Sequence, residues 1–377
     1  MSDIARDSPH PVRNIEVNPG AFFPNSSTMV RGEVALTDFR DADGLVSPDH
    51  PITETWVPFI AVMPDRPATD AGAPVAVYGH GLTVSKETMG TVAGVNSSRG
   101  VATIGIDVPN HGERQAGQGG HLMDLANPQS LGRMIGMVSQ GIVDQVSLVE
   151  AIEEELAGLD VSPWSIDGNH GDGVPDFYTD TILLEGTSMG SVLGASEVAL
   201  IPEIDAAFLQ VAGTGIADTL YHSQLWSVFS GVVPWNASAG DAAALMGVAT
   251  MLLDPADATH LQDELRESGR PVFLQVGVGD QIVPNASAHR LGAILGLEQM
   301  EPTHGATNLP SSGSTALPPD GRGVKEIWPT RSSAENQGFV AHVSFMEPAG
   351  LKLLQDWLGD RLAAEGLSTG LIQGPTP

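Results

Sequence analysis

The chain has 377 residues, enough for one large domain or two modest ones, and it carries 46 acidic against 17 basic residues, a formal charge of −29. That charge repels phosphate backbones and anionic lipid, so nucleic-acid binding is a poor hypothesis. The absence of cysteine excludes disulfides, thiolate metal sites and cysteine nucleophiles.

Short runs rich in Val, Ile and Ala alternate with helical patterns, which is typical of a mostly parallel sheet covered by helices. Two antiparallel strands are expected early, TMVRGEVALTDF (28–39) and TETWVPFIAVMP (53–64). Buried-strand patterns then follow at 73–81, 101–110, 180–190, 205–213 and 270–280, with a weaker one at 324–330.

Helices are predicted around 129–157 and from about 346 to 366. Pro348 suits the first turn of the last helix and Gly366 its end. Residues 299–323, rich in Pro, Gly and Ser, predict an excursion loop. We expect four parts: an N-terminal extension with the first strands (1–66), a first core segment (67–213), a helical cap (214–268) and a second core segment (269–377).

The stretch LLEGTSMGS (183–191) contains a Gly-Xaa-Ser-Xaa-Gly motif between a buried strand and a helical pattern. A strand, a tight turn and a helix would place Ser188 at the strand's carboxyl end, where a nucleophile is exposed. Gly186 and Gly190 leave room for the turn and for close helix packing. The alternative is a glycine-bearing turn without chemistry, and a base and an acid elsewhere would separate the two interpretations.

A serine hydroxyl needs an imidazole to take its proton. His342 follows the last predicted strand and precedes the terminal helix, so its loop faces the same sheet edge as Ser188. Asp280 ends the strand pattern of 270–280 and can fix the tautomer of the imidazole, although aspartate in this position can also simply cap a turn. The chain order Ser188, Asp280, His342 differs from that of the two common serine-protease folds.

Acyl transfer also needs hydrogen-bond donors for the developing oxyanion. The segment GHGL (79–82) ends a strand, and we expect the main-chain N–H groups of Leu82 and Met189 to form the hole. Gly81 lets the chain turn inward there. His80 is expected to support this loop rather than to perform chemistry.

The set GHGL, GIDVPNHGER, GTSMGS, GDQIVP and AHVSF resembles the α/β-hydrolase superfamily, in its serine esterase and lipase branch, and is most similar to bacterial extracellular lipases and carboxylesterases. The resemblance covers most of residues 70–365. It implies an α/β-hydrolase fold: a mostly parallel central sheet with helices on both faces, an N-terminal β extension and a helical cap insertion. The distance in sequence from Asp280 to His342 is longer than the family usually shows, which the loop at 299–323 can explain.

The activity that this resemblance implies is hydrolysis of short- to medium-chain carboxylic esters, small or lipid-like, with no cofactor required for catalysis. A lipase or an aliphatic-polyester hydrolase is an alternative on the same fold, and a non-catalytic binding protein is the alternative of another class. Dehalogenases and epoxide hydrolases carry Asp where this chain has Ser188.

Two weaker patterns concern substrate and metal. Apolar side chains of the cap could line an acyl pocket, or could simply be core: Tyr221, Trp226, Phe229 and Met246. The acidic loop at 165–180 offers hard oxygen ligands for a structural Ca²⁺, although an acidic surface turn is the simpler interpretation. Its candidate ligands are Asp167, Asn169, Asp172 and Asp176.

The first residues, MSDIARDSPHPVRN, lack the apolar core of a secretory signal, and no stretch approaches the roughly 20 apolar residues of a membrane helix. We therefore expect a soluble protein without a transmembrane segment, and a secreted or periplasmic mature form is favoured over a cytoplasmic one. The oligomeric state stays open.

Overall fold

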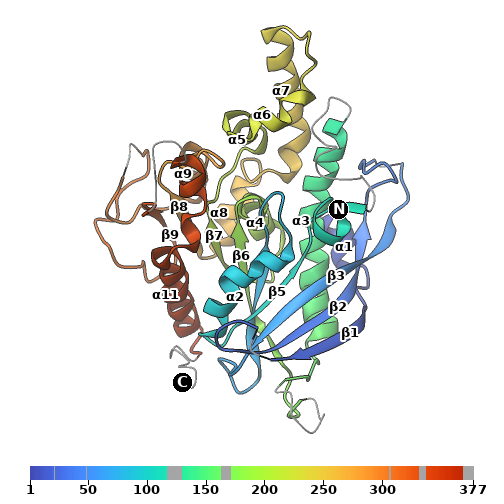
Figure 1. The fold of residues 1–377 in the computed structure, drawn as a ribbon, viewed down its shortest axis with the longest axis vertical. Coiled ribbons are helices and arrows are strands. Elements are labelled where there is room, and N and C mark those ends of the chain that lie inside the picture. The colour runs from blue at the N-terminus through green and yellow to red at the C-terminus, as the bar shows by residue number, and fades with distance from the viewer. Residues whose placement is uncertain are drawn as a thin grey trace.

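The computed structural model describes residues 1–20, 22–47, 49–116, 130–162, 171–304, 307–330 and 337–367. Its centre is a nine-stranded sheet in the order β1-β2-β3-β5-β4-β6-β7-β8-β9 (Figure 1). The strands are β1 (Val12–Pro19), β2 (Ser26–Asp38), β3 (Thr53–Pro64), β4 (Ala73–Gly79), β5 (Ala102–Ile106), β6 (Phe177–Thr187), β7 (Ile204–Gln210), β8 (Val272–Gly277) and β9 (Gly323–Ile327).

The sheet has an antiparallel part and a parallel part. β1, β2 and β3 pair antiparallel, and β3 joins β5 in the same sense, while all pairs from β5 to β9 are parallel. The six strands from β4 to β9 fall where the buried patterns place them. The carboxyl ends of these parallel strands all meet at one edge of the sheet, where the loops of an α/β protein bind ligands.

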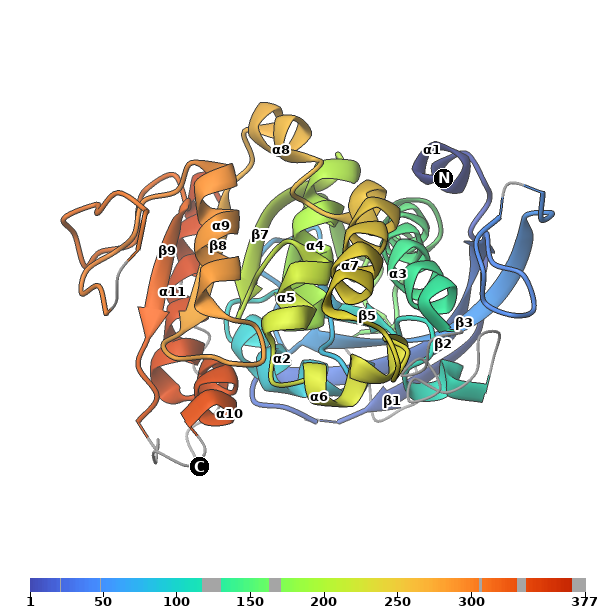
Figure 2. The same cartoon turned by 90° about the horizontal axis from the view of Figure 1, so that it is seen from above.

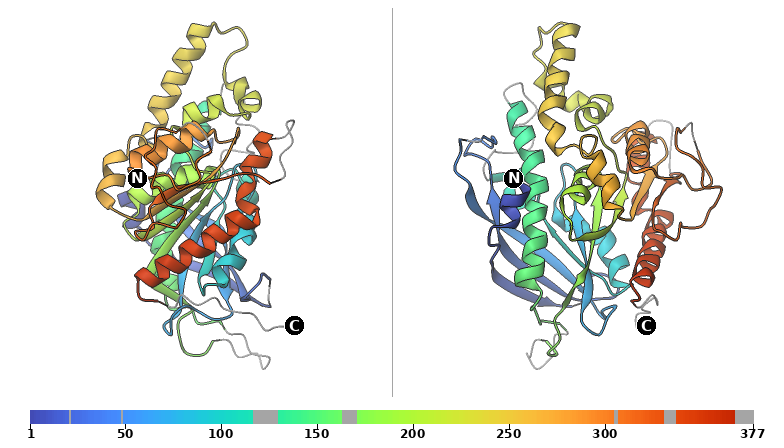
Figure 3. Two further views of the ribbon diagram at one scale, coloured as in Figure 1. Left: turned by 90° about the vertical axis from the view of Figure 1, so that its left-hand side faces the viewer. Right: turned by 180° about the vertical axis from the view of Figure 1, so that it is seen from behind.

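Helices cover both faces of the sheet. On one face the core includes side chains of α3 (Leu131–Ala151), α4 (Met189–Leu200), α8 (Gln262–Ser268) and α9 (Asn285–Leu295). On the other face α2 (Gly90–Ser97) and α11 (Pro348–Ala364) pack, and Trp357 of α11 is fully buried beside Phe208 of β7. Figure 3 shows α3 lying along one face of the sheet and α11 along the other.

Between β7 and β8 the chain is helical, as the sequence predicts. It forms α5 (Ile216–His222), α6 (Trp226–Phe229), α7 (Ala239–Leu253) and then α8. The view from above places α5, α6 and α7 over the edge of the sheet, beside α4 and α3 (Figure 2). Of these, α8 packs on α4 and α9, as a core helix does. Among the described helices none is long and apolar enough to cross a membrane.

The first strand was not predicted. The early antiparallel strands were expected at 28–39 and 53–64, yet a further strand, β1, precedes them and begins at Val12. Its sequence, VRNIEVNP, is largely polar and half-exposed, because an edge strand pairs on one side only. The remaining short helices are α1 (Ser2–Arg6) and α10 (Gln337–His342). The described part of 299–322 contains neither helix nor strand, as expected of the excursion loop.

The turn between β6 and α4 is unusually tight. Ser188 has φ 57° and ψ −117°, outside the regions that side chains ordinarily allow. The close approach of three backbones forces this shape: a Cβ on Gly190 would lie 2.1 Å from the carbonyl oxygen of Gly79 in β4. A Cβ on Gly186 would lie 2.5 Å from the carbonyl oxygen of Gly190. Only glycine lets α4 begin this close to β4 and β6.

Replacing Gly190 tests this contact. Gly190→Ala should lower the free energy of unfolding by about 3 kcal/mol or more, because backbone atoms cannot move aside as a flexible side chain does. Gly247→Ala is the matched control, since Gly247 lies within α7 and a Cβ there meets no atom within 4 Å. That control should raise stability by roughly 0.5–1 kcal/mol. Equal effects of both changes in chemical denaturation would contradict the tight packing.

Candidate active site

Ser188 lies at the carboxyl end of β6 and at the first turn of α4. Its main-chain N–H donates to the carbonyl oxygen of Gln210 in β7 at 3.0 Å, which ties the turn to the neighbouring strand. Ser191 donates its hydroxyl to Gly186 O and to Gln210 O, both at 2.6 Å. These bonds fix the main chain on either side of Ser188. The residue itself is 7% exposed.

The structure brings Ser188, His342 and Asp280 together. His342 Nε2 lies 2.8 Å from Ser188 Oγ, and His342 Nδ1 lies 2.7 Å from Asp280 Oδ2. A carboxylate can only accept, so Nδ1 carries the ring proton and Nε2 is free to accept the serine's. In sequence, His342 is 62 residues from Asp280 and 154 residues from Ser188. All three residues are buried.

Each partner of Ser188 is positioned by its own element. Asp280 follows β8, and its Oδ1 accepts from the N–H groups of Ile282 at 2.8 Å and Val283 at 3.1 Å. These two bonds fix the carboxyl group with Oδ2 toward the histidine. His342 is the last residue of α10, whose backbone lies close to Gly277 at the end of β8.

The loop after β4 passes beside Ser188. An added Cβ on Gly81 would lie 3.4 Å from Ser188 Cβ, and Leu82 and Met189 border the same cavity as the serine. His80 is fully buried: its Nε2 accepts from Val108 N–H at 2.9 Å, so Nδ1 donates to Gly81 O at 2.8 Å. Burial lowers the pKa of His80, which keeps the ring neutral and suited to both bonds.

Sequence reasoning missed a buried ion pair behind this loop. Lys86, in the helical turn Lys86–Met89, is fully buried with its Nζ 2.8 Å from Asp107 and 2.6 Å from Glu113. Burial alone would lower the pKa of Lys86, but its bonds to these two carboxylates outweigh burial and raise it. Asp107 Oδ1 also accepts from the N–H of Lys86, so the pair ties the loop after β4 to the end of β5.

A second buried pair continues this network to α3. Arg114 donates to Asp107 O at 2.8 Å and to Asp144 Oδ2 at 2.6 Å, and Gln140 donates to Asp144 Oδ1 at 2.8 Å. Asp107 and Arg114 of this network both belong to the motif GIDVPNHGER. The signal available in the sequence was Lys86 itself, one of only three lysines, within a predicted loop.

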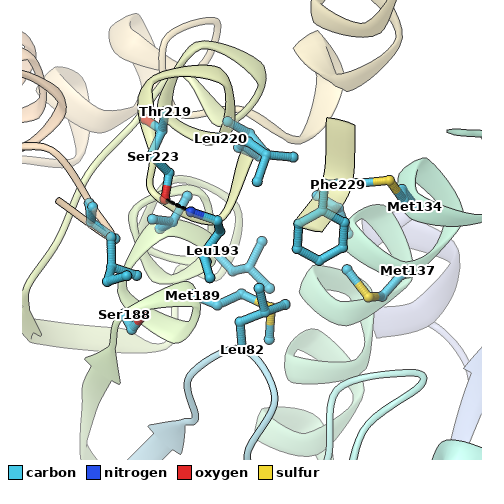
Figure 4. A pocket seen from close by; sticks show the side chains of 16 residues that line it. Leu82, Met134, Met137, Ser188, Met189, Leu193, Thr219, Leu220, Ser223 and Phe229 are labelled. Carbon is cyan, nitrogen blue, oxygen red and sulfur yellow. Dashed lines mark hydrogen bonds between the residues drawn. The ribbon is translucent and has the colours of Figure 1, made fainter. Parts of the chain in front are cut away.

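An apolar cavity opens at Ser188. Its wall comes from α3, α4, α5, α6 and the loops after β4 and β8 (Figure 4). The lining residues are Leu82, Met134, Met137, Val138, Ser188, Met189, Val192, Leu193, Ile216, Thr219, Leu220, Ser223, Leu225, Phe229, Ile282 and Val283.

Of the four cap residues predicted to line a pocket, Phe229 does so and the other three lie elsewhere. Tyr221 and Met246 border a separate hollow between α5 and α7, and Trp226 packs edge-on against Tyr221 with ring centroids 5.2 Å apart. Helical periodicity is the reason. The cavity face of α5 carries residues 216, 219, 220 and 223, so Tyr221 points about 100° away from Leu220.

The two ends of the cap are joined at Asp257. Its buried carboxylate accepts from Thr214 Oγ1 and from the N–H groups of Gly215 and Ile216, where α5 begins. It also accepts from the N–H of Thr259. Burial alone would raise the pKa of Asp257, but these donors outweigh burial and lower it. The start of α5, whose side chains line the cavity, is thereby fixed to the core.

The predicted calcium ligands are not assembled in the described part of the chain. Asp167 and Asn169 lie outside the described residues. Asp176 is engaged by the N–H groups of Val161 and Ser162, while the main-chain N–H of Asp172 bonds to Asp160. Among the described residues, no group of three or more ligating side chains is placed to hold a metal ion.

Comparisons with known proteins support the fold. No family model matches the sequence, and no curated protein does. Acetyl xylan esterase 1 from Thermoanaerobacterium sp. JW/SL YS485 superposes with a TM-score of 0.52 at 12% identity, covering 92% of this chain and 90% of that one. Acetyl xylan esterase from Paenibacillus sp. R4 gives 0.51 at 11% identity, covering 91% of each. The chain has the α/β-hydrolase fold.

Within this α/β-hydrolase fold, Glu185 lies buried in β6 three residues before Ser188. Its Oε2 accepts from Asn96 Nδ2 at 3.0 Å, and no ion pair forms with it among the described residues. Burial raises its pKa from the ordinary 4.5 to about 7, and the bond from Asn96 offsets only part of that rise. The folded state therefore binds this proton more tightly than the unfolded chain does.

A raised carboxyl pKa makes stability fall with pH. The contribution of Glu185 is fully present below its unfolded pKa and is lost as the pH rises to about 7, whereas Glu185→Gln holds the same acceptor for Asn96 at every pH. The stability of the variant relative to the parent should rise by about 2 kcal/mol between about pH 5.5 and about pH 8.5. Urea denaturation at several pH values measures this. Glu267→Gln, at an exposed position on α8, removes the same charge and is the control, which should change stability little at any of these pH values.

Proposed function

We propose that this protein is a serine hydrolase that cleaves carboxylic esters through an acyl-enzyme intermediate. The observation that carries the proposal is the continuous hydrogen-bonded line from Ser188 to His342 to Asp280, at 2.8 and 2.7 Å. We base it on this geometry, because structural likeness at 11–12% identity supports the fold alone.

The first half-reaction uses His342 as a base. Nε2 takes the proton of Ser188 as Oγ bonds to the ester's carbonyl carbon, and Asp280 stabilises the imidazolium that forms. The carbonyl oxygen becomes an oxyanion beside the N–H groups of Leu82 and Met189. The N–H of Met189 has no partner within the helix, because Met189 is the first residue of α4. The bond from carbon to the alcohol oxygen then breaks, and the imidazolium gives its proton to the leaving alcohol.

The second half-reaction repeats these steps with water. His342 takes a proton from the water as its oxygen bonds to the acyl carbon. The bond to Ser188 Oγ breaks, the proton returns to Oγ, and the carboxylic acid leaves. Each proton returns to its starting group, and the chain's own residues supply every catalytic group in this cycle.

The alternative of a non-catalytic binding protein predicts that one of the three side chains is missing or out of reach. All three are present and bonded, which favours the hydrolase. The strain at Ser188 points the same way, since such conformations persist mainly where function requires them.

Removing the nucleophile tests the proposal directly. Ser188→Ala should lower the kcat/KM for p-nitrophenyl butyrate by roughly 10⁴- to 10⁶-fold, with the unfolding midpoint nearly unchanged. A fluorophosphonate probe should label the parent at Ser188 and leave this variant unlabelled. Ser314→Ala is the control: Ser314 is an exposed serine in the loop between α9 and β9, and this variant should keep both activity and labelling. Labelling or turnover that survives in Ser188→Ala would remove this serine from the mechanism.

Asp280→Asn tests the tautomer argument. The amide oxygen can keep the bonds from Ile282 and Val283, so the fold should persist, but its NH₂ would then face His342 Nδ1. The imidazole would have to accept there and carry its proton on Nε2, where it cannot take the proton of Ser188. We expect kcat to fall roughly 10³- to 10⁴-fold with little change in KM. A kcat within about tenfold of the parent's would contradict the role of Asp280.

A further inference from the structure

From Ser188 the cavity extends toward α3 and α6, and the loop after β8, with Ile282 and Val283, completes its wall. In Figure 4, Leu82 and Met189 lie next to Ser188, and Met134, Met137 and Phe229 lie across the cavity from it. His342 is not among the described residues that line the cavity. Among the described residues, the cavity therefore borders both residues of the proposed oxyanion hole but not the histidine that would protonate the leaving alcohol.

This asymmetry distinguishes the two halves of an ester. The leaving alcohol oxygen must receive its proton from His342 Nε2, so the alcohol has to lie on the histidine's side. The oxyanion must face the N–H groups of Leu82 and Met189. Of the groups on the tetrahedral carbon, only the acyl substituent remains free to enter the cavity.

Resting on the proposed function, we infer that this cavity binds the acyl half of the ester. Met134 and Met137 of α3 and Phe229 of α6 form the wall that limits its length. The alcohol half lies outside the cavity and is weakly selected. The enzyme thus selects its substrates by the acid they contain and not by the alcohol.

The lining also sets the chemistry of the acyl group. Among the described residues that line the cavity none is charged, and three of them carry a hydroxyl: Ser188, Thr219 and Ser223. Thr219 Oγ1 lies 2.6 Å from Ser287 Oγ and 2.9 Å from Thr214 O, and Ser223 Oγ accepts from Leu225 N–H at 3.1 Å. Thr219 is engaged by the protein, and the Ser223 hydroxyl has only its own hydrogen left to donate, so a charged or strongly polar acyl group would lose its hydration and gain at most one partner. The acyl group is apolar.

Two ester series separate the acyl half from the alcohol half. The acyl series is p-nitrophenyl esters from acetate to dodecanoate, and the alcohol series is alkyl acetates from ethyl to octyl. In the parent, kcat/KM should rise with acyl length by up to about fourfold per methylene until the wall is reached, and then fall. In the alcohol series it should change little. A strong dependence on the alcohol with none on the acid would overturn the assignment.

Changing the wall should move the acyl optimum. Met137→Trp should lower kcat/KM about tenfold or more for the best long acyl ester and leave acetate within about threefold. Met137→Ala should shift the optimum to longer acids, and neither change should alter the alcohol series. Phe229→Ala tests the same wall from the cap if a change at Met137 prevents folding. Met251→Ala is the control: the side chain is 72% exposed on α7, and both profiles should stay as in the parent.

A matched pair tests the apolar requirement. The p-nitrophenyl hemiester of glutaric acid carries a carboxylate where p-nitrophenyl valerate has a methyl group, and it should react at least about 100-fold more slowly. Comparable rates for the two would overturn the apolar assignment.

The outcomes separate this inference from the proposed function. If no ester is hydrolysed and no probe labels Ser188, the hydrolase proposal fails. If esters are hydrolysed while folded variants at Met137 and Phe229 keep the parent's acyl profile, the hydrolase proposal stands and the acyl assignment fails.

Discussion

The close contact of α4 with β4 and β6 is the constraint on which the candidate site depends. Gly186 and Gly190 let three backbones approach within distances that no Cβ allows, and Ser188 takes up the resulting strain at φ 57°. A strained residue persists only where its surroundings over-determine it, and here buried parallel strands lie on both sides. The histidine and the aspartate are held by other elements, so their 2.8 and 2.7 Å contacts require the turn to stay where it is.

The sequence predicted the parts of the fold whose signals are local. The buried strands of the parallel sheet read as short apolar runs, and the turn at Ser188 is visible as a strand, two glycines and a helix. Asp280 and His342 could be chosen because residues that follow parallel strands meet at one edge. The edge strand β1 gave no such signal, since it is half-exposed and largely polar. The pairs of Lys86 with Asp107 and of Arg114 with Asp144 were missed because burial of a charge depends on a partner 21 or 30 residues away.

Helical periodicity predicts some of the residues that line the cavity but not all of them. Choosing aromatic and large apolar residues of the cap found Phe229 but also Tyr221, Trp226 and Met246, which lie on other faces. Choosing residues by helical spacing, such as Met134 and Met137 on α3, would have identified one wall. The start of α5 is fixed by Asp257, which joins the cap's start to its end across 42 residues. No local pattern carries that information.

The distribution of charge reconciles an acidic protein with this chemistry. Exposed carboxylates more than a Debye length from the site, about 8 Å at physiological salt, act on it only weakly. Within the site, Asp280 bonds directly to His342, and the cavity wall is uncharged. A carboxylate in the cavity wall would compete with Asp280 for the imidazolium and repel the oxyanion. The acidic residues of the surface and the uncharged lining described here are therefore compatible with the charges that the proposed reaction would develop.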